Sequence, residues 1–208
     1  MVKSLKDKNQ IPLLAVLAGN LALFYMALNA DSVGAAEWAE LARGSLKALP
    51  AGLGLALIGI VNALLSADMK ARLVFWRWND PLPGARAFSH YAKRDSRINL
   101  DKLKQAHGPF PRSPREQNAV WYGFYRSVAS EPAVTQVHRG YLFARDYTGI
   151  SLLLILVLGG LAAYQMPAAT AGRYIAFLIV QFLIVGLAAR HLGCRFVTTV
   201  LALKGAGS

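Results

Sequence analysis

The chain has 208 residues, of which 55% are hydrophobic and only 16% are charged. Soluble domains carry about 25% charged residues, so this composition argues against an ordinary soluble globule and against a disordered chain. Cys194 is the only cysteine, which excludes an intrachain disulfide framework and a cysteine-based metal cluster. The net charge of +12 would suggest nucleic acid for a soluble protein, but for a membrane protein it first indicates a positive-inside topology.

Long uncharged gaps between charged residues predict four membrane-spanning helices, because about 20 helical residues cross a hydrocarbon core of about 30 Å. We place these spans at residues 11–30, 48–67, 150–164 and 174–189. The fourth is short, and Arg173 and Arg190 at its ends would extend their head groups to the interfaces. The first follows a basic start, as a signal peptide does, but its apolar run is too long, which favours an uncleaved anchor.

The predicted fold is all-α, with four transmembrane helices arranged as two hairpins around a helical cytoplasmic module. The parts are residues 1–67, residues 68–146, and residues 147–208 with a short cytoplasmic tail. Residues 68–146 hold 14 basic and 7 acidic side chains, whereas residues 31–47 are slightly acidic. By the positive-inside rule, both termini and the module are expected in the cytoplasm. No plant or animal targeting signal is evident, so a bacterial inner membrane is the simplest location.

The 79-residue module is too long for a turn and rich in aromatic residues, which predicts an ordered structure. It opens with basic and aromatic residues, a pattern that favours an interfacial belt over the alternative, a site for anionic lipid head groups or a phosphate compound. The candidate ligand-binding or interface residues are Arg72, Trp76, Arg77, Trp78, Arg86, Trp121 and Arg145.

Several local elements of the module are predicted from turn and capping residues. Pro81 to Gly84 is expected to form a fixed turn, after which Phe88 and Tyr91 would lie on a short helix at the membrane surface. Ser113 and Glu116 predict a capping box for a helix over 114–129. The apolar stripe of that helix is as typical of a local core as of a partner groove. A further helix is expected to run from Ala133 directly into the third span.

The stretch FWRWNDPLPGARAF at residues 75–88, with Trp121-Tyr122 and Arg145-Asp146 later, resembles small four-span bacterial inner-membrane proteins. In these proteins two helical hairpins enclose a cytoplasmic segment. The resemblance implies the same architecture for this chain. Some proteins of this plan act as effectors in anti-phage systems, and the resemblance supplies no catalytic residues.

Chemically active motifs are scarce. The four histidines, His90, His107, His138 and His191, lack metal-ligand spacing, and a cluster of His90 and His107 with Asp95 and Asp101 is disfavoured. We therefore expect no catalytic set, no metal and no cofactor. Asn20, Asn62 and Gln181 are polar residues inside predicted spans. They are first interpreted as hydrogen-bonding contacts between helices, and alternatively as the lining of an oligomeric pore.

These observations favour a non-catalytic interaction or effector protein, whose cytoplasmic segment binds a partner or an anionic ligand. Expected partners are anionic membrane lipids, further copies of the chain and a cytoplasmic protein. Nucleic acid is disfavoured, because the basic residues at 93–104 lack neighbouring aromatic side chains for stacking. A channel gated by the module is the first alternative. A membrane enzyme acting on lipid-linked substrates is the second, and it would need histidines beside carboxylates in a cleft.

Overall fold

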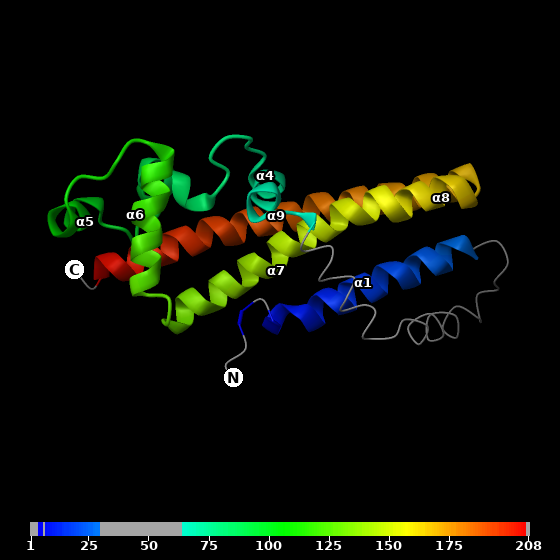
Figure 1. The fold of residues 1–208 in the computed structure, drawn as a ribbon, viewed down its shortest axis with the longest axis horizontal. Helices are drawn as coiled ribbons and strands as arrows, with labels where there is room; N and C mark the ends of the chain where they lie inside the picture. The colour runs from blue at the N-terminus through cyan, green and yellow to red at the C-terminus, as the bar shows by residue number, and fades with distance from the viewer. Residues whose placement is uncertain (1–3, 6, 30–63, 207–208) are drawn as a thin grey trace. The chain divides into compact units, whose positions relative to one another are not determined.

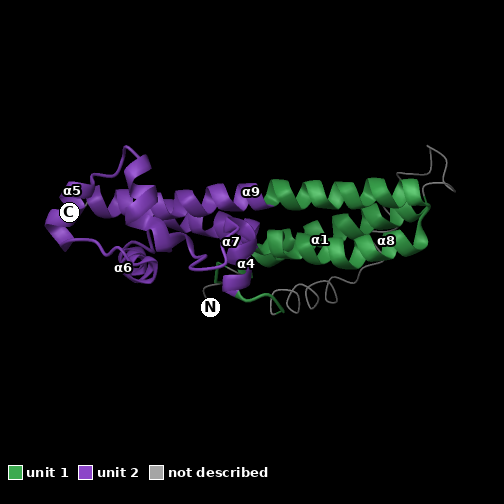
Figure 2. Cartoon of the chain, turned by 90° about the horizontal axis from the view of Figure 1, so that it is seen from above, with its two compact units in different colours: residues 1–66, 146–185 green, residues 67–145, 186–208 purple. Residues whose placement is uncertain are grey.

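The computed structural model describes residues 4–5, 7–29 and 64–206, and among these residues the secondary structure is entirely helical, with no strand. Along the chain the elements are α1 (Asp7–Leu28), α4 (Ala67–Phe75), η1 (Pro83–Arg86), η2 (Ala87–Tyr91), η3 (Ala92–Arg94), α5 (Leu100–His107), α6 (Pro114–Ser127), α7 (Pro132–Leu154), η4 (Ile155–Gly159), α8 (Gly160–Gln165) and α9 (Ala168–Ala206) (Figure 1). They belong to two compact units, unit 1 from residues 1–66 and 146–185, and unit 2 from residues 67–145 and 186–208 (Figure 2).

An apolar helix is present at the predicted first span: α1 covers most of that span but begins earlier, at Asp7. Its start is fixed by a reciprocal pair of hydrogen bonds. The backbone N–H of Asp7 donates to Oγ of Ser4 at 3.2 Å, and the N–H of Ser4 donates to Oδ2 of Asp7 at 3.1 Å. This arrangement satisfies free amide groups at the start of the helix. The second predicted span, 48–67, lies almost entirely outside the described residues, as does Asn62.

The third predicted span is the end of a 34-residue helix that runs from Pro132 to Gln165, which confirms the helix expected to continue into that span. After a turn at Met166 and Pro167, α9 extends for 39 residues. Helix α9 extends beyond the predicted span 174–189 at both ends. Arg173 lies inside α9, where its Nε donates to the carbonyl of Ala169 at 3.2 Å. The residues expected as a tail after position 189 are helical as far as Ala206.

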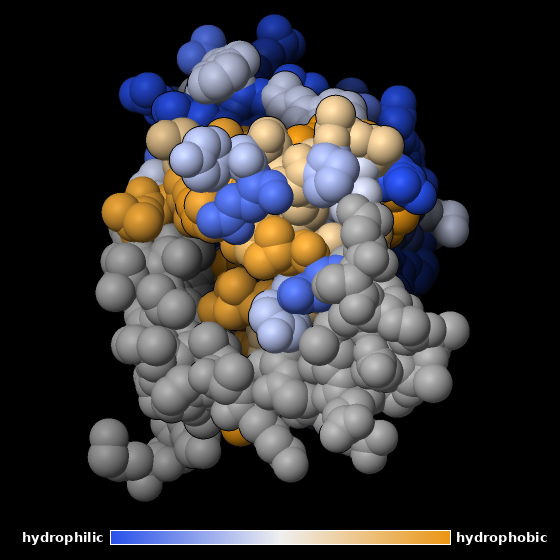
Figure 3. Space-filling view, turned by 90° about the vertical axis from the view of Figure 1, so that its right-hand side faces the viewer, coloured by the Kyte–Doolittle hydropathy of each residue, from blue (hydrophilic) through white to orange (hydrophobic). Residues whose placement is uncertain are grey.

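Three helices of the described chain are long and apolar enough to cross a membrane, with mean hydropathy of 1.9 to 2.0 in their most apolar windows, which suggests a membrane protein. Helix α9, at about 58 Å for 39 residues, is about twice as long as a hydrocarbon core is thick. Its large exposed apolar side chains are Phe177, Ile179, Val180, Leu183, Ile184 and Leu187. Apolar exposure of this extent is typical of a surface that lipid or another helix covers. Hydrophobic residues also gather over the end where α8 meets α9 (Figure 3).

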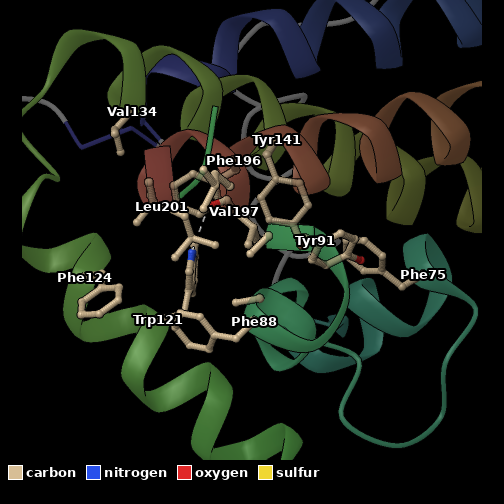
Figure 4. Packing of buried hydrophobic residues seen from close by; sticks show 14 of the residues in the cluster. Phe75, Phe88, Tyr91, Trp121, Phe124, Val134, Tyr141, Phe196, Val197 and Leu201 are labelled. Atoms are coloured by element: carbon tan, nitrogen blue, oxygen red, sulfur yellow. Dashed lines mark hydrogen bonds between the residues drawn. The ribbon is translucent and has the colours of Figure 1, made fainter. Parts of the chain in front are cut away.

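Aromatic and aliphatic contacts between distant segments form the core of unit 2 (Figure 4). Phe196 of α9 stacks on His138 of α7 at a ring distance of 4.4 Å and meets Trp121 of α6 edge-on at 5.1 Å. The apolar stripe predicted for this helix therefore forms part of the local core rather than a groove for a partner. Phe88 and Tyr91 lie on the short helix η2, which confirms the predicted helix, but both side chains are buried in this core rather than exposed to a membrane surface.

The start of α6 differs from the prediction in one respect. Ser113 is the N-cap residue and Pro114 occupies the first turn, but the Ser113 side chain accepts no hydrogen bond, so the capping box is not formed. The helix ends at Ser127 rather than at residue 129, because the N–H of Val128 turns back to the carbonyl of Tyr125 at 3.1 Å. A side-chain cap occurs instead at α5, where Oδ1 of Asn99 accepts from the N–H of Lys102 at 2.9 Å.

Candidate ligand-binding site

The turn that follows α4 has unusual backbone geometry. Helix α4 ends at Phe75, and the next residue, Trp76, has a φ of 51°. Asp80, at the other end of the turn, has a φ of 46°. Bulky residues in this left-handed region are strained, and such strain is concentrated at ligand-binding and other functional positions. The turn carries Trp76 and Trp78, which are 59% and 78% exposed.

Arg190 of α9 stabilises the start of this turn. Its Nε donates to the carbonyl of Val74 near the end of α4 at 3.2 Å, which satisfies a carbonyl that the helix leaves free. Its guanidinium lies 4.6 Å from the centre of the Trp76 ring, within the range of a cation–π contact. Arg190 therefore acts on the shape of the turn, from a position 116 residues away in the chain.

Arg77 is held by residues of the unit 2 core. Its guanidinium lies 5.8 Å from the Phe75 ring, and its positive charge opposes the rise in the pKa of the neighbouring Tyr91. Nη1 of Arg77 is buried without a hydrogen-bond partner among the described residues. Tyr91 hydrogen-bonds with Cys194, and burial raises the pKa of both Tyr91 and Cys194. A thiol with a raised pKa stays protonated and unreactive at neutral pH. This arrangement does not favour a nucleophilic role for Cys194.

Beside the strained turn lies a cavity of about 580 Å³, lined by α4, the turn, η1 and the first residues of α6. Its lining residues are Asp68, Arg72, Trp78, Asn79, Asp80, Pro81, Leu82, Ala85, Pro114, Arg115 and Asn118. Arg115 and Asp80 form an ion pair with Nε and Oδ1 3.5 Å apart. By contrast, Nε of Arg72 is buried and has no hydrogen-bond partner among the described residues. An unsatisfied charged donor is costly to bury, and because Arg72 also lines the cavity, its guanidinium is the candidate anion-binding group of the site.

Close packing of η1 against α6 fixes the wall of the cavity. A Cβ atom added to Gly84 would lie 2.5 Å from Oδ1 of Asn118 and 2.5 Å from Cε3 of Trp121, so only glycine fits there. Gln117 holds the next turn in place. Its Oε1 accepts from the N–H groups of Phe88 at 3.3 Å and Ser89 at 3.1 Å, and its Nε2 donates to the carbonyl of Arg112 at 3.1 Å. Sequence reasoning missed Gln117, because no local pattern distinguishes it from an exposed helical glutamine.

The cavity can bind charged groups of both signs. Arg72 and Arg115 offer guanidinium donors, which suit a phosphate, and Asp68 and Asp80 offer carboxylate acceptors, which suit a cation. Its lining contains neither histidine nor cysteine. Within the part of the chain that the structure describes, no three His, Cys, Asp or Glu residues are grouped so as to hold a metal ion.

Of the seven residues predicted to bind a ligand, Arg72 and Trp78 line the cavity, and Trp76 and Arg77 lie on the adjoining turn. The other three lie elsewhere in unit 2. Trp121 is buried, and its Nε1 donates to the carbonyl of Val197 at 3.4 Å. Arg145 is buried with its guanidinium 5.9 Å from the Tyr141 ring, whereas Arg86 is exposed at the end of η1.

Two of the predicted intramembrane polar residues come together in unit 1. The side chains of Asn20 of α1 and Gln181 of α9 both hydrogen-bond with the Tyr147 side chain of α7. Asn20 also donates from Nδ2 to the carbonyl of Val16 at 2.9 Å. Oδ1 of Asn20 and Nε2 of Gln181 are buried without partners among the described residues. The predicted role of Asn20 and Gln181 in joining helices is consistent with this cluster.

The fold and the site define a helical protein with long apolar helices and a compact helical unit that carries a charged cavity. Comparisons with protein-family models, curated proteins and solved structures find no match.

Proposed function

We propose that this chain is a four-span inner-membrane protein of bacteria, with both termini in the cytoplasm, whose cytoplasmic module binds a phosphate-bearing ligand. The observation that carries the proposal is the cavity beside α4, where Arg72 has a buried Nε without a partner among the described residues. Phosphate is the ligand group that best matches a guanidinium, because two phosphate oxygens can accept hydrogen bonds from two parallel N–H groups of the arginine. The exposed tryptophans beside the cavity suit a position at the membrane interface.

A non-catalytic effector role fits this site better than an enzyme. The cavity lining lacks a histidine or cysteine that would transfer protons or attack a substrate. His138 is hydrogen-bonded through Nδ1 to the Tyr125 hydroxyl at 3.1 Å, and His107 lies against the Phe124 ring at 4.7 Å. These histidines thus have packing partners within unit 2. Binding of a ligand, rather than its conversion, is the activity we propose.

Native mass spectrometry of the full chain, released from a mild detergent, tests the proposal. We expect the wild-type protein to retain a phosphate-bearing species, identified by its mass and by fragmentation, and we expect Arg72→Gln to lose it. Arg126→Gln is the matched control, because Arg126 is an exposed arginine of the same unit that does not line the cavity. Equal retention by Arg72→Gln and Arg126→Gln would refute the site. The same spectra give the number of chains in each particle.

A channel is the second candidate function, and the cluster of Asn20, Tyr147 and Gln181 favours it, because partnerless amide atoms within apolar helices suit a polar path. It predicts an ion leak from proteoliposomes that changes in Gln181→Leu but not in Gln165→Leu, a glutamine exposed at the end of α8. A leak of equal size in the wild type, in both variants and in protein-free vesicles would exclude this function.

A further inference from the structure

The charges around the cavity specify more than a phosphate. We propose that its ligand is the head group of a zwitterionic phospholipid, in which a phosphate ester carries a primary ammonium group, as in phosphatidylethanolamine. This inference rests on the proposed phosphate-binding function and narrows it to one class of compound. The phosphate would pair with Arg72, and the ammonium group with Asp68 and the rim carboxylate of Asp80.

The main argument is the presence of two unpaired charges of opposite sign. Asp68 lies four residues before Arg72 on α4, so the two side chains share one face of the helix. Both residues line the cavity, and neither forms an ion pair among the described residues. A ligand with one negative and one positive group complements this pair. It satisfies Arg72 without leaving Asp68 beside an anion.

The carboxylates also disfavour the other phosphate compounds. A nucleoside triphosphate or a diphosphate would bring several negative charges next to Asp68 and Asp80, and these like charges would repel each other. Phosphatidylglycerol has one phosphate but no cation, so it would leave Asp68 unpaired. Phosphatidylcholine carries a cation without N–H donors, so it cannot donate hydrogen bonds to the carboxylates.

The place of the cavity in the chain favours a lipid over a soluble aminophosphate. Asp68 directly follows the segment predicted as the second span, so the cavity begins where the chain is proposed to leave the membrane. Trp76 and Trp78 are the large exposed side chains of the adjoining turn, and tryptophan is enriched at the level of the head groups. A lipid head group is present at that level at high local concentration.

The test uses the full chain in nanodiscs that contain equal amounts of phosphatidylethanolamine, phosphatidylglycerol and phosphatidylcholine. Native mass spectra of the released protein count the retained lipids. We expect the wild type to retain phosphatidylethanolamine over each of the others by about tenfold or more, the factor expected for one charged hydrogen bond. Asp68→Asn should remove most of that preference. Arg72→Gln should lower retention of all three lipids. Asp101→Asn, at an exposed carboxylate of α5, is the control and should match the wild type.

The outcomes separate the two proposals. Retention of phosphatidylglycerol in preference to phosphatidylethanolamine, if it depends on Arg72, overturns the zwitterionic ligand and leaves the phosphate site standing. Retention that is the same in Arg72→Gln and in the wild type overturns both. Titration with free O-phosphoethanolamine in detergent distinguishes the source of the ligand. Binding of this compound that depends on Asp68 and Arg72, without lipid selectivity in nanodiscs, overturns the membrane source. Thermal unfolding of each variant verifies that it is folded.

Discussion

Replacing Gly84 by alanine tests the packing that forms the wall of the cavity. The new Cβ would lie 2.5 Å from Oδ1 of Asn118 and from Cε3 of Trp121, whereas carbon atoms pack best at about 3.5–4 Å. Trp121 cannot move aside freely, because it is 4% exposed and its Nε1 donates to the carbonyl of Val197. Overpacking of this kind costs about 1–3 kcal/mol, and the lower entropy of unfolded alanine offsets about 0.4–1 kcal/mol. We expect a net loss of about 1–2 kcal/mol.

Unfolding of unit 2 can be followed by heating the full chain in detergent with a fluorogenic maleimide. Cys194 is the single thiol of the chain, is half-buried in unit 2 and reacts when that unit opens. For a unit of about 100 residues, a loss of 1–2 kcal/mol lowers the midpoint by roughly 5–10 °C. Gly123→Ala is the matched control, because a Cβ there meets no atom within 4 Å. Alanine inside a helix is favoured over glycine, so this midpoint should rise by a few degrees.

The comparison of the two alanine variants decides the question, since both make the same chemical change in neighbouring elements. A Gly84→Ala midpoint equal to or above that of Gly123→Ala would refute the close approach of η1 to α6. Retention of the ligand by Gly84→Ala gives a second measurement. Because Asn118 lines the cavity and would be displaced, retention should fall together with stability.

Further predictions concern single side chains of unit 2. Burial, and next the charge of Arg145, lowers the pKa of His138 to about 4. The fold favours neutral His138, so the free energy of unfolding should be highest above pH 6.5 and fall by about 1–2 kcal/mol as the pH drops toward 4. This loss is smaller than the full pKa shift implies, because the ring is partly exposed. In His138→Asn, the melting midpoint should lack this dependence on pH. The hydrogen bond from Arg97 holds the pKa of Asp95 well below 3.8, so Asp95→Asn should cost about 0.3–1 kcal/mol at neutral pH. This difference in stability should begin to shrink near pH 4 and disappear only as the pH falls through the depressed pKa of folded Asp95. Gln117→Leu leaves two backbone N–H groups without partners and should destabilise unit 2 by about 2–4 kcal/mol in the same thiol assay. Trp78→Ala should weaken ligand retention in native mass spectra and leave the melting midpoint almost unchanged, because Trp78 is 78% exposed.

The apolar helices were predictable because the signal is local. A long run without charge has few alternatives to a helix in lipid, so α1 and the end of the helix that contains α7 appear near their predicted positions. The limits of α9 were not predictable in the same way. Arg190 and the residues after it were assigned to a boundary and a tail, but Arg190 bonds to α4 and Phe196 joins the unit 2 core. These are long-range contacts that charge spacing does not encode.

In the candidate site, too, the features set by local sequence were predictable and those set by long-range packing were not. Its residue types were predicted, because basic and aromatic side chains follow the second predicted span in sequence. The wall of the cavity was not, because it depends on the approach of Gly84 to Asn118, which only the packing of η1 on α6 reveals. Gln117 is a second example. It is 1% exposed, and both its amide oxygen and its amide nitrogen form hydrogen bonds, yet its sequence neighbours are charged or polar residues typical of an exposed helix.

The arginines around the turn explain why Arg72 is the residue on which the proposals depend. In the sequence, Arg72 and Arg77 lie close to Trp76 and Trp78, and the fold adds Arg190 as a third cation near Trp76. In the structure, Arg190 supports α4 and Trp76, and Arg77 is held by Phe75 and Tyr91, so removing either would alter the turn itself. Arg72 has no such contact among the described residues, its Nε is buried without a hydrogen-bond partner, and the residue lines the cavity. Loss of the Arg72 charge should therefore change binding with little effect on the fold, whereas loss of Arg190 should change both.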